Sequence, residues 1–362
     1  MAMSEEAQKA TLNDIYSRSL HQPRGQAARR QALIKIIQLT RSPFPSVKKE
    51  SSQVLGTFFE EFPDIQDQVV DAVYDLCEDS NPEVRLDGYK VIVELSKRVK
   101  TWTRRNTDVL IQLLQSEDIV ELGVVKRSLL EHIKNDPEGA LGVMCDYCIG
   151  SSDAPDTALK GLVINFLLYD AKSEREKILS SVPEPEAAKT LRAGLVQSIP
   201  RADIVQLPII LNDLLFPPPA RSPAGLLPAA LEALMAQSGL VLDQELPTSP
   251  TLPDTMLHLS LASGLLRQPG DPTHLLRFLT GRIVPLSMDL TVLAKLEPDT
   301  RFMLVSHTTE VFKTCRSKAN SATAWPELLA LRNKMTDVGN VWPDVGGSSE
   351  GFDFGSNLPF QH

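Results

Sequence analysis

Apolar residues in the first 200 positions recur at the spacing of an amphipathic helix, in runs separated by short polar stops. The alternation of apolar and polar residues that is typical of strands is almost absent. The pattern therefore predicts an all-α region, with helices at residues 5–20, 25–41, 46–60, 65–78, 83–99, 104–115, 118–134, 137–149, 155–171 and 184–198.

A short phrase recurs along this region and opens an apolar helical run each time. Residues 45–48 are Pro-Ser-Val-Lys and residues 82–85 are Pro-Glu-Val-Arg, and blurred copies begin near Val120 and at Pro155. The interval of roughly 35–38 residues is typical of helical solenoids, in which each repeat buries its apolar face against its neighbours. The second phrase is of the kind that opens helices in HEAT repeats. We therefore predict a right-handed α-solenoid of HEAT-like helix pairs.

The composition changes beyond residue 200, where charged residues become sparse and proline becomes frequent. Consecutive prolines at about 215–225 cannot continue a helix, and they predict an exposed joint. Leucine-rich helices are expected again at residues 225–240, 254–268, 272–287, 298–318 and 322–341. The predicted domains are HEAT-like repeats at 1–200, an armadillo-like or irregular helical region at 201–345, and a flexible or docked Gly/Ser-rich tail at 346–362.

Charge and cysteine content limit the classes of protein. The 362 residues carry a formal net charge of -9, which argues against a surface made chiefly for nucleic acid. The four cysteines are few for this length and lie in apolar helical runs, so a reducing compartment without disulfides is expected. No apolar run approaches the roughly 20 residues needed to cross a bilayer, and the acidic start is unlike a targeting peptide. A soluble, intracellular protein is predicted.

Several segments between residues 49 and 150 resemble the apoptosis inhibitor 5 family in order and spacing. They are Phe-Phe-Glu-Glu-Phe-Pro-Asp at 58–64, Leu-Cys-Glu-Asp at 76–79, Val-Arg at 84–85, Leu-Ile-Gln-Leu-Leu-Gln-Ser-Glu-Asp at 110–118 and Gly-Ala-Leu-Gly at 139–142. The resemblance implies a nuclear all-α protein of HEAT-like and armadillo-like repeats that acts through partners without catalysis. It also implies suppression of apoptosis and a link to mRNA-export machinery that includes a DEAD-box helicase.

The chain departs from the animal members of this family in two places. Their leucine-zipper-like stretch is broken here by Pro-Gly-Asp-Pro at residues 269–272. Their basic Arg/Gly-rich tail with its nuclear-import signal is replaced by Gly-Phe-Asp-Phe-Gly-Ser-Asn-Leu-Pro-Phe-Gln-His at 351–362. The chain therefore resembles a divergent, non-animal member, and RNA contact is expected to be weak or indirect.

An LxxLL motif is a first candidate for partner binding. Leu110, Leu113 and Leu114 form one stripe of a helix, and such a stripe can dock in an apolar groove of a partner. The same spacing is what a solenoid helix presents to its own neighbours. Both interpretations remain open at this stage, and packing in the core is favoured.

Charged clusters provide two further candidates. The acidic one can place its side chains on one helical face, either as a negative strip for a basic partner or as an ordinary solvated face. Its members are Asp64, Asp67, Asp71, Asp75 and Glu78. The basic one is a candidate import signal or phosphate contact, or simply the cationic end of a helix. Its members are Lys97, Arg98, Lys100, Arg104 and Arg105.

An aromatic and acidic segment lies in the tail. Its Phe-Asp-Phe tripeptide resembles short peptides that bind DEAD-box helicases, and the alternative is that the aromatic residues fold back to cap the solenoid. The residues concerned are Trp342, Phe352, Asp353, Phe354 and Phe360.

No pattern of residues indicates an active site or a cofactor. The Cys145-x-x-Cys148 pair lacks further ligands at metal-binding spacing, and the six histidines are scattered. The sequence thus predicts a monomeric, non-catalytic nuclear scaffold that binds proteins and not membranes, with no cofactor or metal. The candidate partners are a DEAD-box mRNA-export helicase and apoptosis-related nuclear factors. The alternative is a solenoid that binds RNA.

Overall fold

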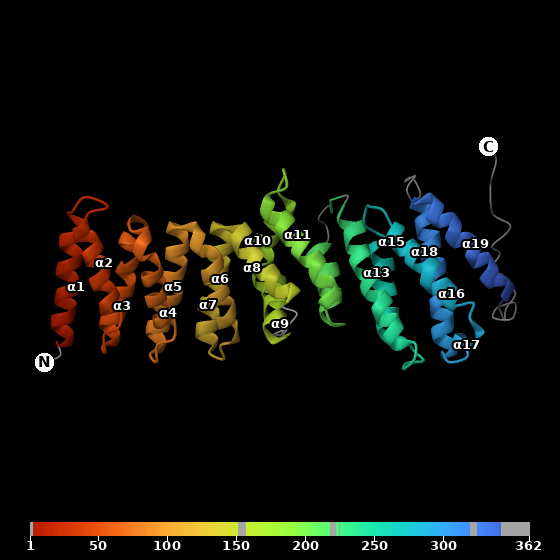
Figure 1. Cartoon of the computed structure of the whole chain (residues 1–362), viewed down its shortest axis with the longest axis horizontal. Helices are drawn as coiled ribbons and strands as arrows, with labels where there is room; N and C mark the ends of the chain where they lie inside the picture. The colour runs from red at the N-terminus through yellow and green to blue at the C-terminus, as the bar shows by residue number, and fades with distance from the viewer. Residues whose placement is uncertain (1–2, 151–156, 218–221, 224, 319–323, 342–362) are drawn as a thin grey trace. The chain divides into compact units, whose positions relative to one another are not determined.

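The computed structural model describes residues 3–150, 157–217, 222–223, 225–318 and 324–341. Contacts divide the chain into two compact units, Met1–Gly194 (unit 1) and Leu195–His362 (unit 2). The division falls within one helix, α11 (Glu186–Ser198). All regular elements in the described residues are helical, so the all-α prediction is confirmed (Figure 1). The handedness, the repeat types and the predicted domain boundaries stay predictions.

Unit 1 consists of helix pairs packed side by side in two layers (Figure 1). Successive helices of the first layer contact one another, and they are α1 (Glu5–Leu20), α3 (Pro45–Leu55), α5 (Pro82–Arg98) and α7 (Ile119–Asn135). The second layer contains α2 (Ala27–Leu39), α4 (Gln66–Cys77), α6 (Thr103–Gln112) and α8 (Pro137–Ile149). Further along the unit are α9 (Thr157–Asn165), the π-helix η5 (Phe166–Asp170) and α10 (Lys172–Ser180).

The recurring phrase begins helices as predicted. Pro45 and Pro82 are the first residues of α3 and α5, where a missing N–H costs nothing. The Asn81 side chain accepts hydrogen bonds from the N–H groups of Glu83 and Val84 and so caps α5. Val47 and Val84 are fully buried between neighbouring repeats. The third copy differs from the first two, because the helix there begins at Ile119 and no proline is present.

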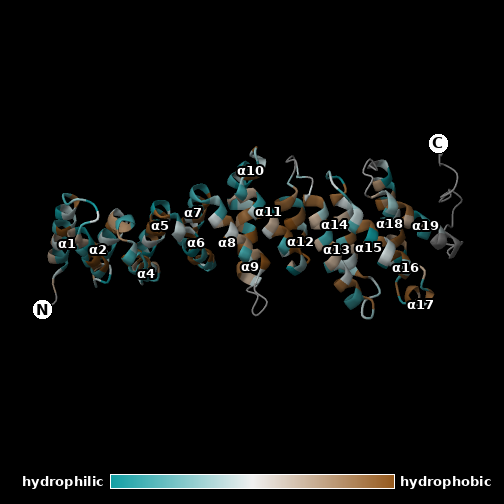
Figure 2. Cartoon of the chain, turned by 45° about the horizontal axis from the view of Figure 1, so that its top comes forward, coloured by the Kyte–Doolittle hydropathy of each residue, from teal (hydrophilic) through white to brown (hydrophobic). Residues whose placement is uncertain are grey.

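Unit 2 is built from leucine-rich helices that do not begin with the Pro-x-Val-Lys/Arg phrase (Figure 2). The 20-residue helix α13 (Leu226–Glu245) packs against α14 (Pro253–Leu265) and α15 (Thr273–Phe278). Next come α18 (Pro298–Lys318) and α19 (Trp325–Val341), which contact α14 and α15 respectively. The remaining helices are η6 (Ile199–Arg201), α12 (Gln206–Pro208), the π-helices η7 (Ile209–Leu215) and η8 (Leu279–Ile283), α16 (Val284–Leu286) and α17 (Leu290–Leu293).

The structure differs from the sequence-based expectations at three places. The proline-rich joint is not exposed where the structure describes it, because Leu215 and Phe216 are buried at the end of η7; residues 218–221 and 224 lie outside the described residues. Helices α10 and η7 were not predicted at all. Finally, α13 is long and apolar enough to cross a membrane by length and composition, yet its buried leucines pack on α14 and α15 as in a core helix.

Candidate interaction surface

The predicted acidic strip lies along the outside of unit 1, and arginines of neighbouring repeats pair with it. Asp64 accepts a hydrogen bond from Arg30 at 2.6 Å. Asp67 and Asp71 both bond Arg105, at 3.3 and 3.1 Å. Most of these partners are 34 residues apart. Stacking by one repeat therefore brings opposite charges together and neutralises most of the strip.

The rest of the strip is only partly paired. Asp75 lies 3.4 Å from Arg41, again a neighbouring repeat's cation. Glu78 is exposed at the end of α4 and makes no ion pair with any described residue. The strip therefore keeps a free carboxylate only at its last member.

Arg105 holds two repeats together through more than charge. Its guanidinium lies 5.4 Å from the ring centroids of both Tyr74 and Trp102, within the range of cation–π attraction. The Trp102 indole donates to Gln66 at 2.9 Å. Burial raises the pKa of Tyr74, whose hydroxyl donates to Asn106 at 2.7 Å. Arg105 is thus a structural residue between α4 and α6.

The predicted basic patch is dispersed in the structure. Lys97 lies 3.3 Å from Glu131 of the next repeat, and Arg104 donates to Asp146 at 2.9 Å. Arg98 and Lys100 are exposed and make no ion pair with the residues that the structure describes. Because these side chains serve different contacts, they do not form a continuous basic surface.

The first layer of unit 1 has its own inter-repeat ion pairs. Lys49 bonds Glu83 at 2.6 Å, and Lys48 bonds Asp79. Farther along, Lys126 lies 2.9 Å from Asp170. Both layers of unit 1 are therefore joined from one repeat to the next by opposite charges, which the sequence analysis did not predict.

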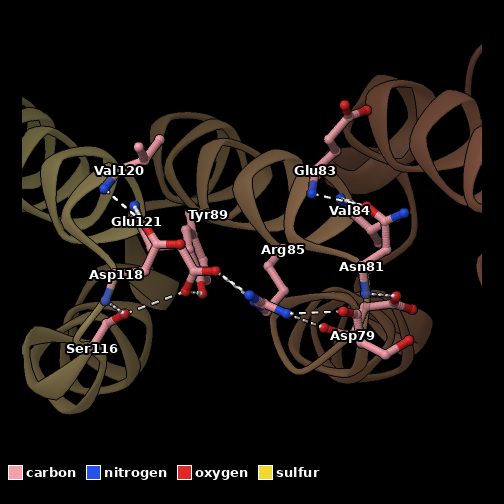
Figure 3. A network of polar contacts seen from close by, with 11 residues as sticks. Asp79, Asn81, Glu83, Val84, Arg85, Tyr89, Ser116, Asp118, Val120 and Glu121 are labelled. Atoms are coloured by element: carbon pink, nitrogen blue, oxygen red, sulfur yellow. Dashed lines mark hydrogen bonds and ion pairs between the residues drawn. The ribbon is translucent and has the colours of Figure 1, made fainter.

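One of these ion pairs, well shielded from solvent, joins Arg85 to Glu121 (Figure 3). The Arg85 Nε donates to Glu121 Oε1 at 2.8 Å, and Nη1 donates to the Asp79 carbonyl at 2.7 Å. Tyr89 and Ser116 donate hydroxyl hydrogen bonds to Glu121 Oε2, at 3.3 and 3.4 Å. Hydrogen bonding to Glu121 raises the pKa of Arg85. The side chain of Glu121 is only 7% exposed, and the side chains of Arg85, Tyr89 and Ser116 stabilise its charge there.

Two large apolar residues next to this network are exposed. Asp118 caps α7 by accepting from the N–H groups of Val120 and Glu121, at 2.7 and 3.2 Å. The cap holds Ile119 and Val120 in the first turn, with 85% and 64% of their surfaces exposed. Sequence patterning alone did not identify this pair. The sequence does contain one signal for this exposure. Glu121 occupies the position that the buried residues Val47 and Val84 occupy in the phrases at 45–48 and 82–85.

The LxxLL motif packs inside unit 1. Leu110 and Leu114 are buried between repeats, and Leu113 is half-buried. The partner-binding interpretation of this stripe is therefore wrong for the folded chain, because a solenoid helix uses this face to contact its neighbours.

The four cysteines, at positions 77, 145, 148 and 315, are all buried. Burial raises the pKa of the Cys145 and Cys148 thiols, so both are held in the protonated form. No group of three or more His, Cys, Asp or Glu side chains that could hold a metal occurs in the described part of the chain. The tail candidates Trp342, Phe352, Asp353, Phe354 and Phe360 lie outside the described residues.

Comparisons with known proteins point to one family. The family described as "Apoptosis inhibitory protein 5 (API5)" matches residues 14–197. Apoptosis inhibitor 5-B of Xenopus laevis is 32% identical over 136 residues, which is 38% of this chain and 25% of that protein. The apoptosis inhibitor 5 homolog of Drosophila melanogaster is 35% identical over 121 residues, which is 33% and 23% of the two chains. The chain thus covers about a quarter of the length of the relatives it matches.

A solved structure of an engineered protein is also similar, with 13% identity and a TM-score of 0.24 over 84% of this chain and 97% of that one. At this TM-score the likeness adds nothing to the fold described above.

Proposed function

Because the chain belongs to the apoptosis inhibitory protein 5 family, we propose that it is a non-catalytic helical-repeat scaffold that binds proteins in the nucleus. Its biological outcomes are suppression of apoptosis and the coupling of nuclear mRNA to export through a DEAD-box helicase. The candidate partners are this helicase and apoptosis-related nuclear factors.

The observation that supports this function is the agreement between the family match and unit 1. The match runs from residue 14 to 197, and unit 1 ends at Gly194. Within that unit, ion pairs join successive repeats in both layers. A stack fixed in this way presents an extended surface of constant spacing, which is how repeat proteins bind other proteins.

The absence of a continuous basic surface in the described residues argues for protein partners over RNA. Arg104 and Arg105 are engaged by carboxylates of neighbouring repeats, and the net charge is -9. A solenoid that binds RNA would need many unpaired cations facing the phosphates.

The test compares protein and RNA binding by the same purified chain. Affinity purification from nuclear extract, with quantitative mass spectrometry, is expected to recover a DEAD-box helicase or an apoptosis-related factor. Titration with labelled single-stranded RNA at physiological salt is expected to give only weak binding. Tight RNA binding with a steep salt dependence would contradict the scaffold function.

A further inference from the structure

The first turns of α5 and α7 occupy equivalent places in consecutive repeats but carry inverted chemistry. The second and third residues of α5 are Glu83, which is exposed, and Val84, which is buried. In α7 the second residue is Val120, which is exposed, and the third is Glu121, which is buried. In α7, unlike α5, the apolar side chain lies at the surface and the carboxylate lies in the core.

The exposed half of this inversion does not stabilise the fold. Ile119 and Val120 keep most of their apolar surface in water, so they forgo the stabilisation that burial gives. As β-branched residues they are also poorer helix formers than glutamate. Meanwhile Glu121 needs Arg85, Tyr89 and Ser116 to offset its desolvation.

Exposed acidic side chains lie on the two turns that Arg85 connects, the one before α5 and the one before α7. Glu117 is exposed directly before the Asp118 cap. On the adjoining turn, Glu78 is exposed as well, whereas Glu83 is paired with Lys49 at 2.6 Å. Arg85 connects the two turns, because it donates to the Asp79 and Ser80 carbonyls and also to Glu121 (Figure 3). The charge of Arg85 is paired with Glu121, so it does not neutralise Glu78 or Glu117.

We propose that Ile119 and Val120, with a rim formed by Glu78 and Glu117, are a docking site for a segment of a partner protein that carries apolar anchors flanked by Lys or Arg. The apolar pair supplies contact area, and the rim supplies charge complementarity that favours a basic segment. This inference rests on the proposed scaffold function and specifies one surface of it.

The chain contains a matched control in unit 2. Asp203 caps the N–H groups of Val205 and Gln206, and Ile204 and Val205 are 51% and 69% exposed. The local arrangement copies that of residues 118–120, but the flanking residues are Arg201 and Ala202 in place of an acidic turn. If docking needs both apolar anchors and the acidic rim, this second pair is not required for it.

The test uses fluorescence polarisation with a labelled peptide, Lys-Lys-Leu-Ile-Leu-Lys-Lys, and a counterpart in which Glu replaces every Lys. The full chain is expected to bind the basic peptide and not the acidic one. The double variant Ile119→Pro/Val120→Glu recreates the start of α5 and should weaken binding by about tenfold or more. Glu117→Lys should weaken it by about threefold or more. Ile204→Ser/Val205→Glu should leave it unchanged.

Three results would overturn the proposal: equal binding of the two peptides, unchanged affinity in Ile119→Pro/Val120→Glu, or an equal loss in the unit 2 control. Unchanged thermal melting of the double variant is expected, since α5 begins with the same residues. A variant that melts early would be replaced by Val120→Glu alone. Nuclear partners recovered by wild-type chain and double variant alike would reject this surface while leaving the scaffold function intact.

Discussion

Units 1 and 2 are both packed from helices, but different forces join one helix pair to the next. In unit 1, opposite charges about one repeat apart link both layers, as Arg105 with Asp71 and Arg85 with Glu121 do. In the described part of unit 2, Arg277 pairs with Glu327 and Arg282 with Asp243. Buried leucines of α13 to α15 supply most of the remaining contact.

The difference shows how a repeat becomes visible in a sequence. A charge pair fixes which residue faces which, so each repeat must keep its partners at constant spacing. Leucine packing tolerates changes of register and of helix length, because apolar contact is not directional. Unit 1 therefore retains a readable repeat, whereas the Pro-x-Val-Lys/Arg phrase does not recur in residues 195–362.

The strongest challenge to this comparison is a charge placed in the core of unit 1. Val84→Asp buries a carboxylate without a partner and is expected to lower the free energy of unfolding by about 4 kcal/mol or more. Glu83→Ala, at the adjacent exposed residue, should cost about 0.5 kcal/mol or less. Urea unfolding followed by circular dichroism measures both. Similar small losses in the two variants would show that Val84 does not fill the joint between repeats.

The next largest effect is expected at the buried ion pair. Arg85→Ala leaves Glu121 buried without its cation and should cost about 3 kcal/mol. In contrast, Arg85→Leu with Glu121→Val replaces the pair by apolar residues and should be much less destabilising than Arg85→Ala. Denaturant unfolding of the single and double variants distinguishes pairing from simple packing. A double variant as unstable as the single one would mean that the charges are not what joins α5 to α7.

A smaller effect of pH is expected at His132 in unit 1. Burial lowers the pKa of His132 to about 4, and its ring contacts the Thr107 hydroxyl at 2.9 Å. The unfolded chain binds a proton at this side chain below its ordinary pKa of about 6.5, while the folded chain does not. Stability is therefore complete above pH 6.5 and is lost as the pH falls towards 4, by about 3 kcal/mol.

The His132 prediction is checked by unfolding curves between pH 4 and 7. His132→Gln has no proton to gain in this range, so its stability should fall less steeply. Identical slopes for wild-type and variant would place the acid sensitivity elsewhere.

The smallest effects are expected along the exposed ion pairs of the second layer. Asp71→Asn should cost about 0.5 kcal/mol or less, because the pair is exposed to solvent and to salt. Arg105→Ala should cost more, about 1 kcal/mol, since it also removes packing on Tyr74 and Trp102. In thermal melts, the difference in stability between wild-type and Asp71→Asn should be smaller at high salt than at low salt. A salt-independent loss would show that charge is not the origin of its effect.

Local patterns were sufficient to predict most of the helices. The predicted helix at 5–20 matches α1, and 137–149 matches α8, because capping residues and apolar spacing are local signals. Helix α10 was missed, since its sequence Lys-Ser-Glu-Arg-Glu-Lys-Ile-Leu-Ser is short and largely charged. The π-helix η7 follows Pro208, and no periodicity of side chains marks it.

The surface was predicted less well than the helices. Asp64, Asp67 and Asp71 are exposed, but their arginine partners come from other repeats. Finding those pairs requires the stacking register, which no single helix contains. The exposure of Ile119 and Val120 likewise became evident only when the third repeat was compared with the second.

The four buried cysteines allow the two units to be timed separately. A thiol reagent reaches a buried sulfur only after the helices around it open, so the labelling rate at each site records a local opening. Cys77, Cys145 and Cys148 report on unit 1, and Cys315 reports on unit 2. The unmodified chain therefore carries its own probes of local unfolding. Mass spectrometry of the labelled peptides would show which of the two units opens faster.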